Sequence, residues 1–255
     1  MPRTAQSIHV ETRGDGQATI LLLHGGGVGG WMWHPLIDHL PAGRRMIVPD
    51  LPGHDRSAAA PYVSHEDALA SIVAVLDEHT DAPVSVVGFS LGAQLAVLLA
   101  SERPDLVSDA VVISAQAIPM RMPRTTLAML AMAAPLARNQ RFARAQAQEL
   151  FIPDVLMDEY LRTSATISTA DLVAAVGENI RFTVPDGWAA FPGRSLVLAG
   201  SDERRMMRSS AAILAERHPR SEMEIVDGCG HGIPLQRPAW LAQRLGEWWQ
   251  APSVL

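Results

Sequence analysis

The sequence contains a single cysteine, Cys229, so no disulfide can form within the chain. Such a chain is typical of a reducing compartment. Residues 1–7 lack the apolar core of a secretory signal peptide. The longest apolar stretches, 127–137 and the run after Gly92, are shorter than the roughly 20 residues that a membrane helix needs. These absences predict a cytoplasmic protein without a membrane partner.

Blocks of basic residues are also missing. The 21 Lys and Arg residues are outnumbered by 27 Asp and Glu residues, and the net charge is -6. Nucleic acid is therefore not an expected partner. No internal repeat and no low-complexity linker divides the chain. With 255 residues, of which 48% are hydrophobic and 19% charged, the chain is too apolar for disorder and suits one large domain or one domain with an insertion.

Short apolar runs alternate with helical patterns along the chain. Continuous runs of this length are typical of strands buried on both faces, and they span residues 20–23, 46–48, 84–87, 110–113, 196–198 and 223–226. The helical patterns cover residues 64–79, 91–101, 206–217 and 239–249. This alternation predicts an α/β fold with a mainly parallel sheet flanked by helices. Residues 8–19 are expected to add antiparallel edge strands.

Residues 117–188 interrupt this alternation. They are rich in Ala, Met and Leu, contain no clear strand pattern, and have helical patterns at 125–138, 141–149, 153–163 and 169–179. We interpret them as a helical insertion between two strands of the sheet. The expected organisation is a main domain made of residues 1–116 and 189–255, with a helical cap at 117–188.

The segment Gly88-Phe89-Ser90-Leu91-Gly92 fits the pattern G-x-S-x-G. It follows an expected strand and opens an expected helix, which is the context in which this pattern forms a nucleophile elbow. The sharp turn would expose the Ser90 hydroxyl, and the glycines would allow strand and helix to approach closely. The Leu91 N–H, at the start of the helix, could stabilise an oxyanion. The alternative is an ordinary serine in a glycine-rich turn.

A second glycine-rich segment, His24-Gly25-Gly26-Gly27, follows the first apolar run. It is similar to the loop that supplies the other N–H of an oxyanion hole, and Gly26 is the candidate donor. A flexible glycine turn is the alternative. Phosphate binding fits poorly, because neither a P-loop lysine nor a GxGxxG spacing is present. We expect neither a metal nor an organic cofactor.

His231 is the candidate general base. A serine hydroxyl is a weak nucleophile until a base takes its proton, and imidazole titrates near neutrality. Among nine histidines, His231 lies on a loop after the last expected strand, between two glycines. The acid that orients the imidazole should follow the fifth apolar run, where Asp202 and Glu203 are adjacent. The residues alone leave both carboxylates as candidates.

Together these segments resemble the α/β-hydrolase superfamily, and the resemblance covers nearly the whole chain. Its members often place the acid three residues after the glycine that closes the strand, which favours Glu203 although aspartate is the commoner acid. The family usually has a glycine after the histidine of its Pro-Gly-His segment, where this chain has Asp55. The resemblance also implies a lid, which matches the expected helical insertion.

The resemblance and the serine nucleophile favour acyl transfer to water over the other reactions of this fold. We expect a serine hydrolase that cleaves small to medium, apolar or aromatic carboxylic esters or lactones through an acyl-enzyme on Ser90. The residues expected to line the pocket are Gly27, Trp31, Trp33, Met129 and Leu130. The alternatives are a carbon–carbon bond hydrolase or a lyase with the same Ser and His, and a ligand-binding protein with slow turnover.

Overall fold

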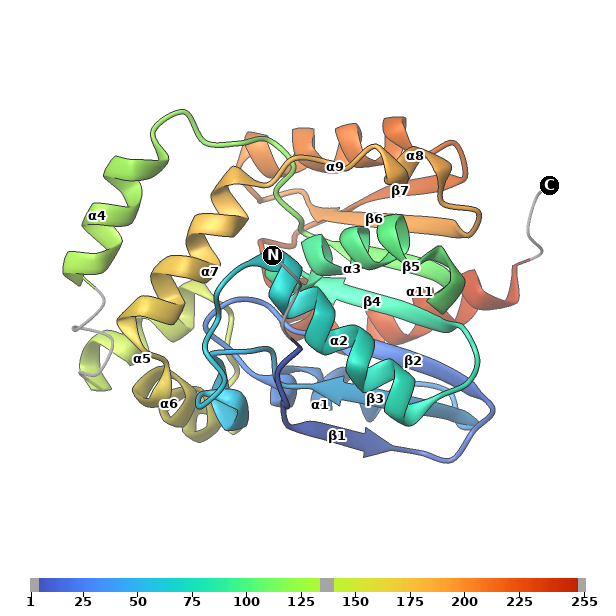
Figure 1. Cartoon of the computed structure of the whole chain (residues 1–255), viewed down its shortest axis with the longest axis horizontal. Helices are drawn as coiled ribbons and strands as arrows, with labels where there is room; N and C mark the ends of the chain where they lie inside the picture. The colour runs from blue at the N-terminus through green and yellow to red at the C-terminus, as the bar shows by residue number, and fades with distance from the viewer. Residues whose placement is uncertain (1–4, 134–139, 252–255) are drawn as a thin grey trace.

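Seven strands form one sheet in the part of the chain that the structure, a computed structural model, describes: residues 5–133 and 140–251 (Figure 1). The sheet order is β1-β3-β2-β4-β5-β6-β7, and only β1 runs antiparallel to its neighbour. The strands are β1 (Val10–Arg13), β2 (Ala18–Leu23), β3 (Arg44–Pro49), β4 (Val84–Phe89), β5 (Val107–Ile113), β6 (Arg194–Gly200) and β7 (Ser221–Val226). The expected mainly parallel sheet is confirmed. Residues 18–19, expected in an antiparallel edge, instead begin β2, which is parallel to both neighbours.

Apolar side chains alternate between two layers, one on each face of the sheet. In β2, Leu21 and Leu23 belong to one layer, and Ile20 and Leu22 belong to the other. Because successive side chains of a strand point to opposite faces, a continuous apolar run fills both layers at once. The first layer packs against α2 (His65–His79), α3 (Leu91–Glu102), α8 (Gly187–Ala190) and α9 (Arg205–Arg217). The second packs against α1 (His34–Ile37), α10 (Ile233–Gln236) and α11 (Pro238–Gln250).

Helix α2 begins with a side-chain cap. The hydroxyl oxygen of Ser64 accepts a hydrogen bond from the backbone N–H of Asp67 at 3.1 Å. This bond satisfies one of the N–H groups that the first turn of a helix leaves without a partner. Leu69, Ile72 and Leu76 then share the buried face of the helix and pack in the first layer.

Helices α4 (Pro123–Ala133), α5 (Gln140–Glu149), α6 (Met157–Thr166) and α7 (Thr169–Arg181) gather beyond the carboxyl ends of the parallel strands (Figure 1). The helix expected at 125–138 ends within the described residues at Ala133, and residues 134–138 lie outside them. The helix expected at 153–163 is a 3₁₀ helix, Asp154–Leu156, followed by α6. The next element, α8, packs on α3 instead, with Trp188 fully buried in the first layer.

An ion pair connects α6 to the segment that follows β3. Asp55, in the 3₁₀ helix Asp55–Ser57 after β3, has a side chain that is only 2% exposed. Its carboxylate accepts hydrogen bonds from Nε and Nη2 of Arg162 at 3.2 and 3.1 Å. The backbone of Asp55 has a φ of +41°, a value that favours glycine. Asp55, at the position where the resembled family usually has glycine, therefore forms an ion pair with α6.

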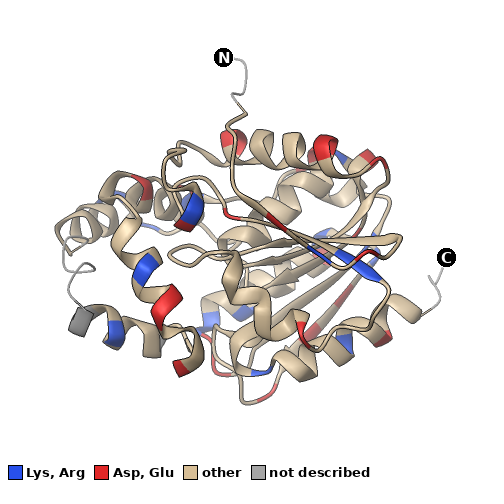
Figure 2. Ribbon diagram, turned by 90° about the horizontal axis from the view of Figure 1, so that it is seen from below, with Lys and Arg blue, Asp and Glu red and all other residues tan. Residues whose placement is uncertain are grey.

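Acidic and basic residues are interspersed on the helices and strands, as Figure 2 shows. Arg44 and Arg194 each place a guanidinium over a tryptophan ring of α11, at 3.9 and 4.4 Å from the ring centroid. Among the described helices, none is long and apolar enough to cross a membrane.

Candidate active site

Ser90 occupies the turn between β4 and α3 in a strained backbone conformation. Its φ is +52° and its ψ is -110°, values that few residues other than glycine adopt. A Cβ atom on Gly88 would lie 2.3 Å from the carbonyl oxygen of Gly92, and one on Gly92 would lie 2.2 Å from that of Leu23. The two glycines therefore allow strand, helix and loop to pack closely, which leaves Ser90 at the carboxyl end of β4.

The imidazole of His231 lies between Ser90 and a carboxylate. His231 follows β7, and its Nε2 atom lies 3.0 Å from Ser90 Oγ. Its Nδ1 atom lies 2.6 Å from Glu203 Oε1, which requires the proton on Nδ1. The ring also lies against Phe89, with centroids 5.2 Å apart. This arrangement allows Nε2 to take the Ser90 proton while the carboxylate stabilises the resulting imidazolium.

Glu203, rather than Asp202, is the carboxylate that meets His231. The side chain of Glu203 is 1% exposed, and its Oε2 accepts the backbone N–H of Gly200 at 2.9 Å. The Glu203 N–H donates to the Gly200 carbonyl at 3.3 Å, so the chain turns back after β6 and carries Glu203 inward. Asp202 is exposed, and its carboxylate accepts a hydrogen bond from Ser201 Oγ at 3.1 Å.

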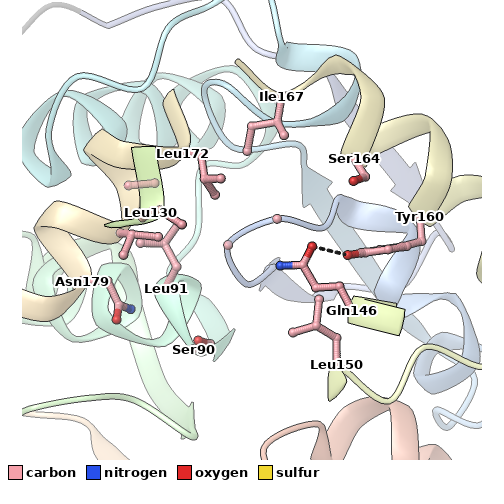
Figure 3. A pocket seen from close by; sticks show the side chains of 14 residues that line it. Ser90, Leu91, Leu130, Gln146, Leu150, Tyr160, Ser164, Ile167, Leu172 and Asn179 are labelled. Carbon is pink, nitrogen blue, oxygen red and sulfur yellow. Dashed lines mark hydrogen bonds between the residues drawn. The ribbon is translucent and has the colours of Figure 1, made fainter. Parts of the chain in front are cut away.

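A cavity of about 250 Å³, called here the Ser90 cavity, lies beside the serine (Figure 3). Its wall combines the loop after β2 and the start of α3 with α4, α5, α6 and α7. The lining residues are all uncharged and mostly apolar: Gly26, Gly27, Ser90, Leu91, Leu130, Gln146, Leu150, Tyr160, Ser164, Ile167, Leu172, Ala175, Val176 and Asn179. Its shape and composition suit a small or medium apolar ligand.

Gly26 and Leu91, the candidate oxyanion donors, are neighbours at this cavity. A Cβ atom on Gly26 would lie 3.8 Å from Leu91 Cδ2. Leu91 begins α3, so its N–H lies at the end of a helix where negative charge is favoured. The two residues and the serine therefore line the same cavity.

His24 connects the glycine loop to the segment after β3. The imidazole is fully buried; its Nδ1 donates to the Gly25 carbonyl at 2.7 Å, and its Nε2 accepts the Leu51 N–H at 2.8 Å. The His54 ring lies 5.2 Å away, and its Nδ1 donates to the Pro52 carbonyl at 2.8 Å. Burial lowers the pKa of both imidazoles, that of His54 to about 3. Both therefore stay neutral and hold loops together.

The expectation for Trp31 and Trp33 is wrong. Both lie in the 3₁₀ helix Gly30–Trp33 and pack in the second apolar layer of the sheet. They are 1% and 0% exposed. Trp31 Nε1 donates to Thr163 Oγ1 at 3.0 Å instead of facing the cavity. Met129 is 62% exposed, because it lies on the outer face of α4, and it does not line the Ser90 cavity. Gly27 and Leu130 do line it.

A polar pair lies opposite Ser90, and no local sequence pattern identifies it. The Tyr160 hydroxyl, from α6, donates to Gln146 Oε1 of α5 at 3.4 Å (Figure 3). Burial raises the pKa of Tyr160 to about 12, so the phenol remains a hydrogen-bond donor. Within the described ranges, no group of three or more His, Cys, Asp or Glu side chains could hold a metal ion.

Comparison with known proteins defines the class that the fold and site indicate. Residues 20–244 match the alpha/beta hydrolase family. The match includes the elbow, the glycine loop, the insertion and the His231 loop, and the chain belongs to this family.

Individual relatives are named for ester cleavage. The chain is 32% identical to "Lipase LipV" of Mycobacterium tuberculosis, over 92% of this chain and 95% of the relative. It is 30% identical to "Pimeloyl-[acyl-carrier protein] methyl ester esterase" of Aromatoleum aromaticum, over 86% of this chain and 93% of the relative. The structure of an esterase from Exiguobacterium antarcticum superposes with a TM-score of 0.82 at 19% identity, over 96% of each chain, which shows a shared fold.

Proposed function

We propose that this protein is a serine hydrolase of carboxylic esters, including lactones, with Ser90 as nucleophile. The observation that supports this most strongly is the line of contacts from Ser90 through His231 to Glu203. These contacts end beside an uncharged cavity in which the serine is accessible. Nucleophile, base and acid are the three groups that acyl transfer needs, in the chain order that this family uses.

The proposed reaction has two halves. Ser90 Oγ attacks the ester carbonyl while His231 Nε2 takes its proton, and the N–H groups of Gly26 and Leu91 donate to the forming oxyanion. Collapse of this intermediate breaks the carbon–oxygen bond, and His231 returns the proton to the leaving alcohol. The acyl group stays on Ser90. Water, deprotonated by His231, then attacks the acyl-enzyme; the bond to Ser90 Oγ breaks, His231 returns the proton to that oxygen, and the carboxylic acid leaves.

The proposed substrates are esters with small to medium, apolar or aromatic acyl groups. The volume of about 250 Å³ limits the size of the acyl group, and the uncharged wall disfavours a charged one. The names of the two curated relatives, a lipase and a methyl ester esterase, are consistent with ester cleavage.

We further propose that residues 117–188, through helices α4 to α7, form a cap on a main domain made of residues 1–116 and 189–255; the last residues of this segment, in α8, pack on α3 instead. Four helices of this segment contribute lining residues to the Ser90 cavity, as Figure 3 shows for Leu130, Gln146, Tyr160 and Leu172. A cap that supplies most of the cavity wall would select substrates while the main domain performs the chemistry. A cytoplasmic location and a small apolar molecule as partner complete the proposal.

The test is a panel of esters, lactones and carbon–carbon bonded β-diketones, offered to the wild type and to Ser90→Ala. We expect ester turnover that falls on the order of 10³-fold or more in the variant. Near-normal turnover by Ser90→Ala would contradict the assignment of the nucleophile. Cleavage of a β-diketone without ester turnover would favour a carbon–carbon hydrolase, and tight binding without product would favour a ligand-binding protein.

A further inference from the structure

A second hollow is lined by His231. This groove, called here the His231 groove, has a volume of about 380 Å³ and is lined by Gln116, Phe151, Asp202, Glu203, Arg204, Met206, Met207, Gly230 and His231. It shares no lining residue with the Ser90 cavity. Leu150 and Phe151 are adjacent in the chain, yet Leu150 lines the Ser90 cavity and Phe151 lines the groove. The two hollows are thus distinct, and this short segment of the chain borders both.

Phe151 has a backbone conformation that an aromatic residue rarely adopts. Its φ is +58°, in the left-handed region that favours glycine. The Phe151 N–H donates to the Gln148 carbonyl at 3.1 Å, and the Ile152 N–H donates to the Ala147 carbonyl at 2.9 Å. This pair of bonds is the Schellman motif that ends many helices, and glycine is the usual residue at the position of Phe151. A strained position of this kind is typical of functional sites.

The loop that carries His231 packs closely against the Phe151 ring. A Cβ atom on Gly230 would lie 2.5 Å from Phe151 Cζ, and one on Gly232 would lie 2.9 Å from Cδ2. The two glycines beside the proposed base thus leave the space that the ring occupies. Phe151 remains 36% exposed, so part of the ring faces the groove.

We propose that the His231 groove binds the alcohol part of the ester, while the Ser90 cavity binds the acyl part. This inference rests on the proposed function. When the tetrahedral intermediate collapses, the carbon–oxygen bond breaks and the leaving oxygen receives the proton that His231 Nε2 had taken from Ser90. The leaving oxygen must therefore lie within hydrogen-bond reach of His231. The alkyl or aryl group on that oxygen then extends towards the hollow that His231 lines.

The lining of the groove indicates which alcohols it takes. Phe151, Met206 and Met207 are half-buried or partly exposed, and they offer an aromatic ring and two adaptable thioether chains. The two exposed charged residues of the lining, Asp202 and Arg204, have opposite signs, so together they favour neither an anionic nor a cationic alcohol. We assign the groove to uncharged apolar or aromatic alcohols, whose release as neutral molecules leaves the acyl group on Ser90.

Two substrate series test this assignment. One holds a butanoyl group fixed and changes the alcohol from methanol to benzyl alcohol, and the other holds methanol fixed and changes the acyl group from acetyl to hexanoyl. The measured quantity is kcat/KM, which reports the acylation step in which the alcohol leaves. The variants are Phe151→Gly, which suits the left-handed backbone and so preserves the end of α5, and Leu150→Ala as the matched neighbour.

We expect Phe151→Gly to lower the benzyl-to-methyl ratio about tenfold and to leave the hexanoyl-to-acetyl ratio within about twofold. Leu150→Ala should do the reverse, and Phe151→Leu should restore most of the benzyl preference. The assignment is wrong if Phe151→Gly alters both ratios alike, or alters only the acyl ratio, or alters neither. Absence of all ester turnover, with Ser90 unlabelled by a fluorophosphonate, would instead overturn the proposed function and the assignment with it.

Discussion

At the scale of single residues, the neighbours Asp202 and Glu203 differ in what their carboxylates touch. Glu203 contacts His231 Nδ1 at 2.6 Å, whereas Asp202 contacts Ser201. Glu203→Gln keeps the size of the side chain but favours the wrong imidazole tautomer, so we expect kcat for ester hydrolysis to fall by up to about 10⁴. Asp202→Asn should cost less than about tenfold. Steady-state kinetics on one ester compares the two variants.

A fall in kcat with Asp202→Asn alone would show that the contact with Glu203 is not the productive one. If neither variant loses activity, the imidazole is oriented by another group. Circular dichroism of both variants would establish that any loss is chemical and does not come from unfolding.

His54 makes a separate prediction, because burial lowers its pKa from 6.5 to about 3. Below pH 6.5 the unfolded chain binds a proton that the folded chain excludes, so the folded state loses stability as the pH falls from about 6.5 towards 3. This loss approaches roughly 1.4 kcal/mol per pH unit. In urea unfolding between pH 7 and pH 5, His54→Asn should therefore show a shallower fall in the free energy of unfolding. An unchanged pH dependence in the variant would contradict this account of His54.

The residues of the site differ in how far the sequence could reveal them. Ser90 and His231 are each flanked by glycines. Neighbouring atoms leave no room for a Cβ atom at those glycines, so the glycine pattern in the sequence reflects the local geometry of the site. Trp31 lies just after the glycine loop, but its place in the sequence does not indicate that it packs in the second apolar layer of the sheet. Tyr160 and Gln146 come from different helices, and only the packing of α5 on α6 brings them to one cavity.

At the scale of elements, the two faces of α4 should differ in their effect on substrates. Leu130 lines the Ser90 cavity, whereas the adjacent Met129 is 62% exposed. Leu130→Asp places a charge at an uncharged wall, so the preference for hexanoyl over acetyl esters should fall roughly tenfold or more. Met129→Asp, the matched control, should change this preference by less than about twofold. The ratio of kcat/KM for the two esters measures the effect.

Equal losses of preference in Leu130→Asp and Met129→Asp would mean that charge on α4 acts at a distance and not through the cavity wall. No change in either variant would mean that the acyl group binds elsewhere.

Elements of the sheet were more predictable than those of the insertion. Each strand of the parallel part except the edge strand β7 fills two apolar layers, so it leaves a continuous apolar run in the sequence. In β7, expected to be buried on both faces, Met223 and Ile225 are 40% and 41% exposed. The insertion helices bury only part of their surface, and their ends depend on neighbours: a 3₁₀ helix, Asp154–Leu156, precedes α6. The four residues of α8 are too few to show a helical period in the sequence. Contacts of Trp188 with α3 and α9 hold this helix in place.

At the scale of the whole molecule, the site depends on strand order. Ser90, Glu203 and His231 follow β4, β6 and β7, which share one sheet, and parallel strands all end at the same edge. Residues more than a hundred positions apart in the sequence thus meet within hydrogen-bond distance. The glycine loop after β2 and the insertion after β5 come to the same edge and complete the cavity.

The central claim is that an ester substrate acylates Ser90. Rapid-quench mixing with p-nitrophenyl butyrate, followed by intact-protein and peptide mass analysis, tests this directly. We expect a burst of p-nitrophenol that approaches one equivalent per chain if deacylation is slower than acylation, with a butanoyl group on the peptide that contains Ser90 and none in Ser90→Ala. Steady turnover in the wild type with the acyl group on another residue, or equal turnover in Ser90→Ala, would contradict the claim.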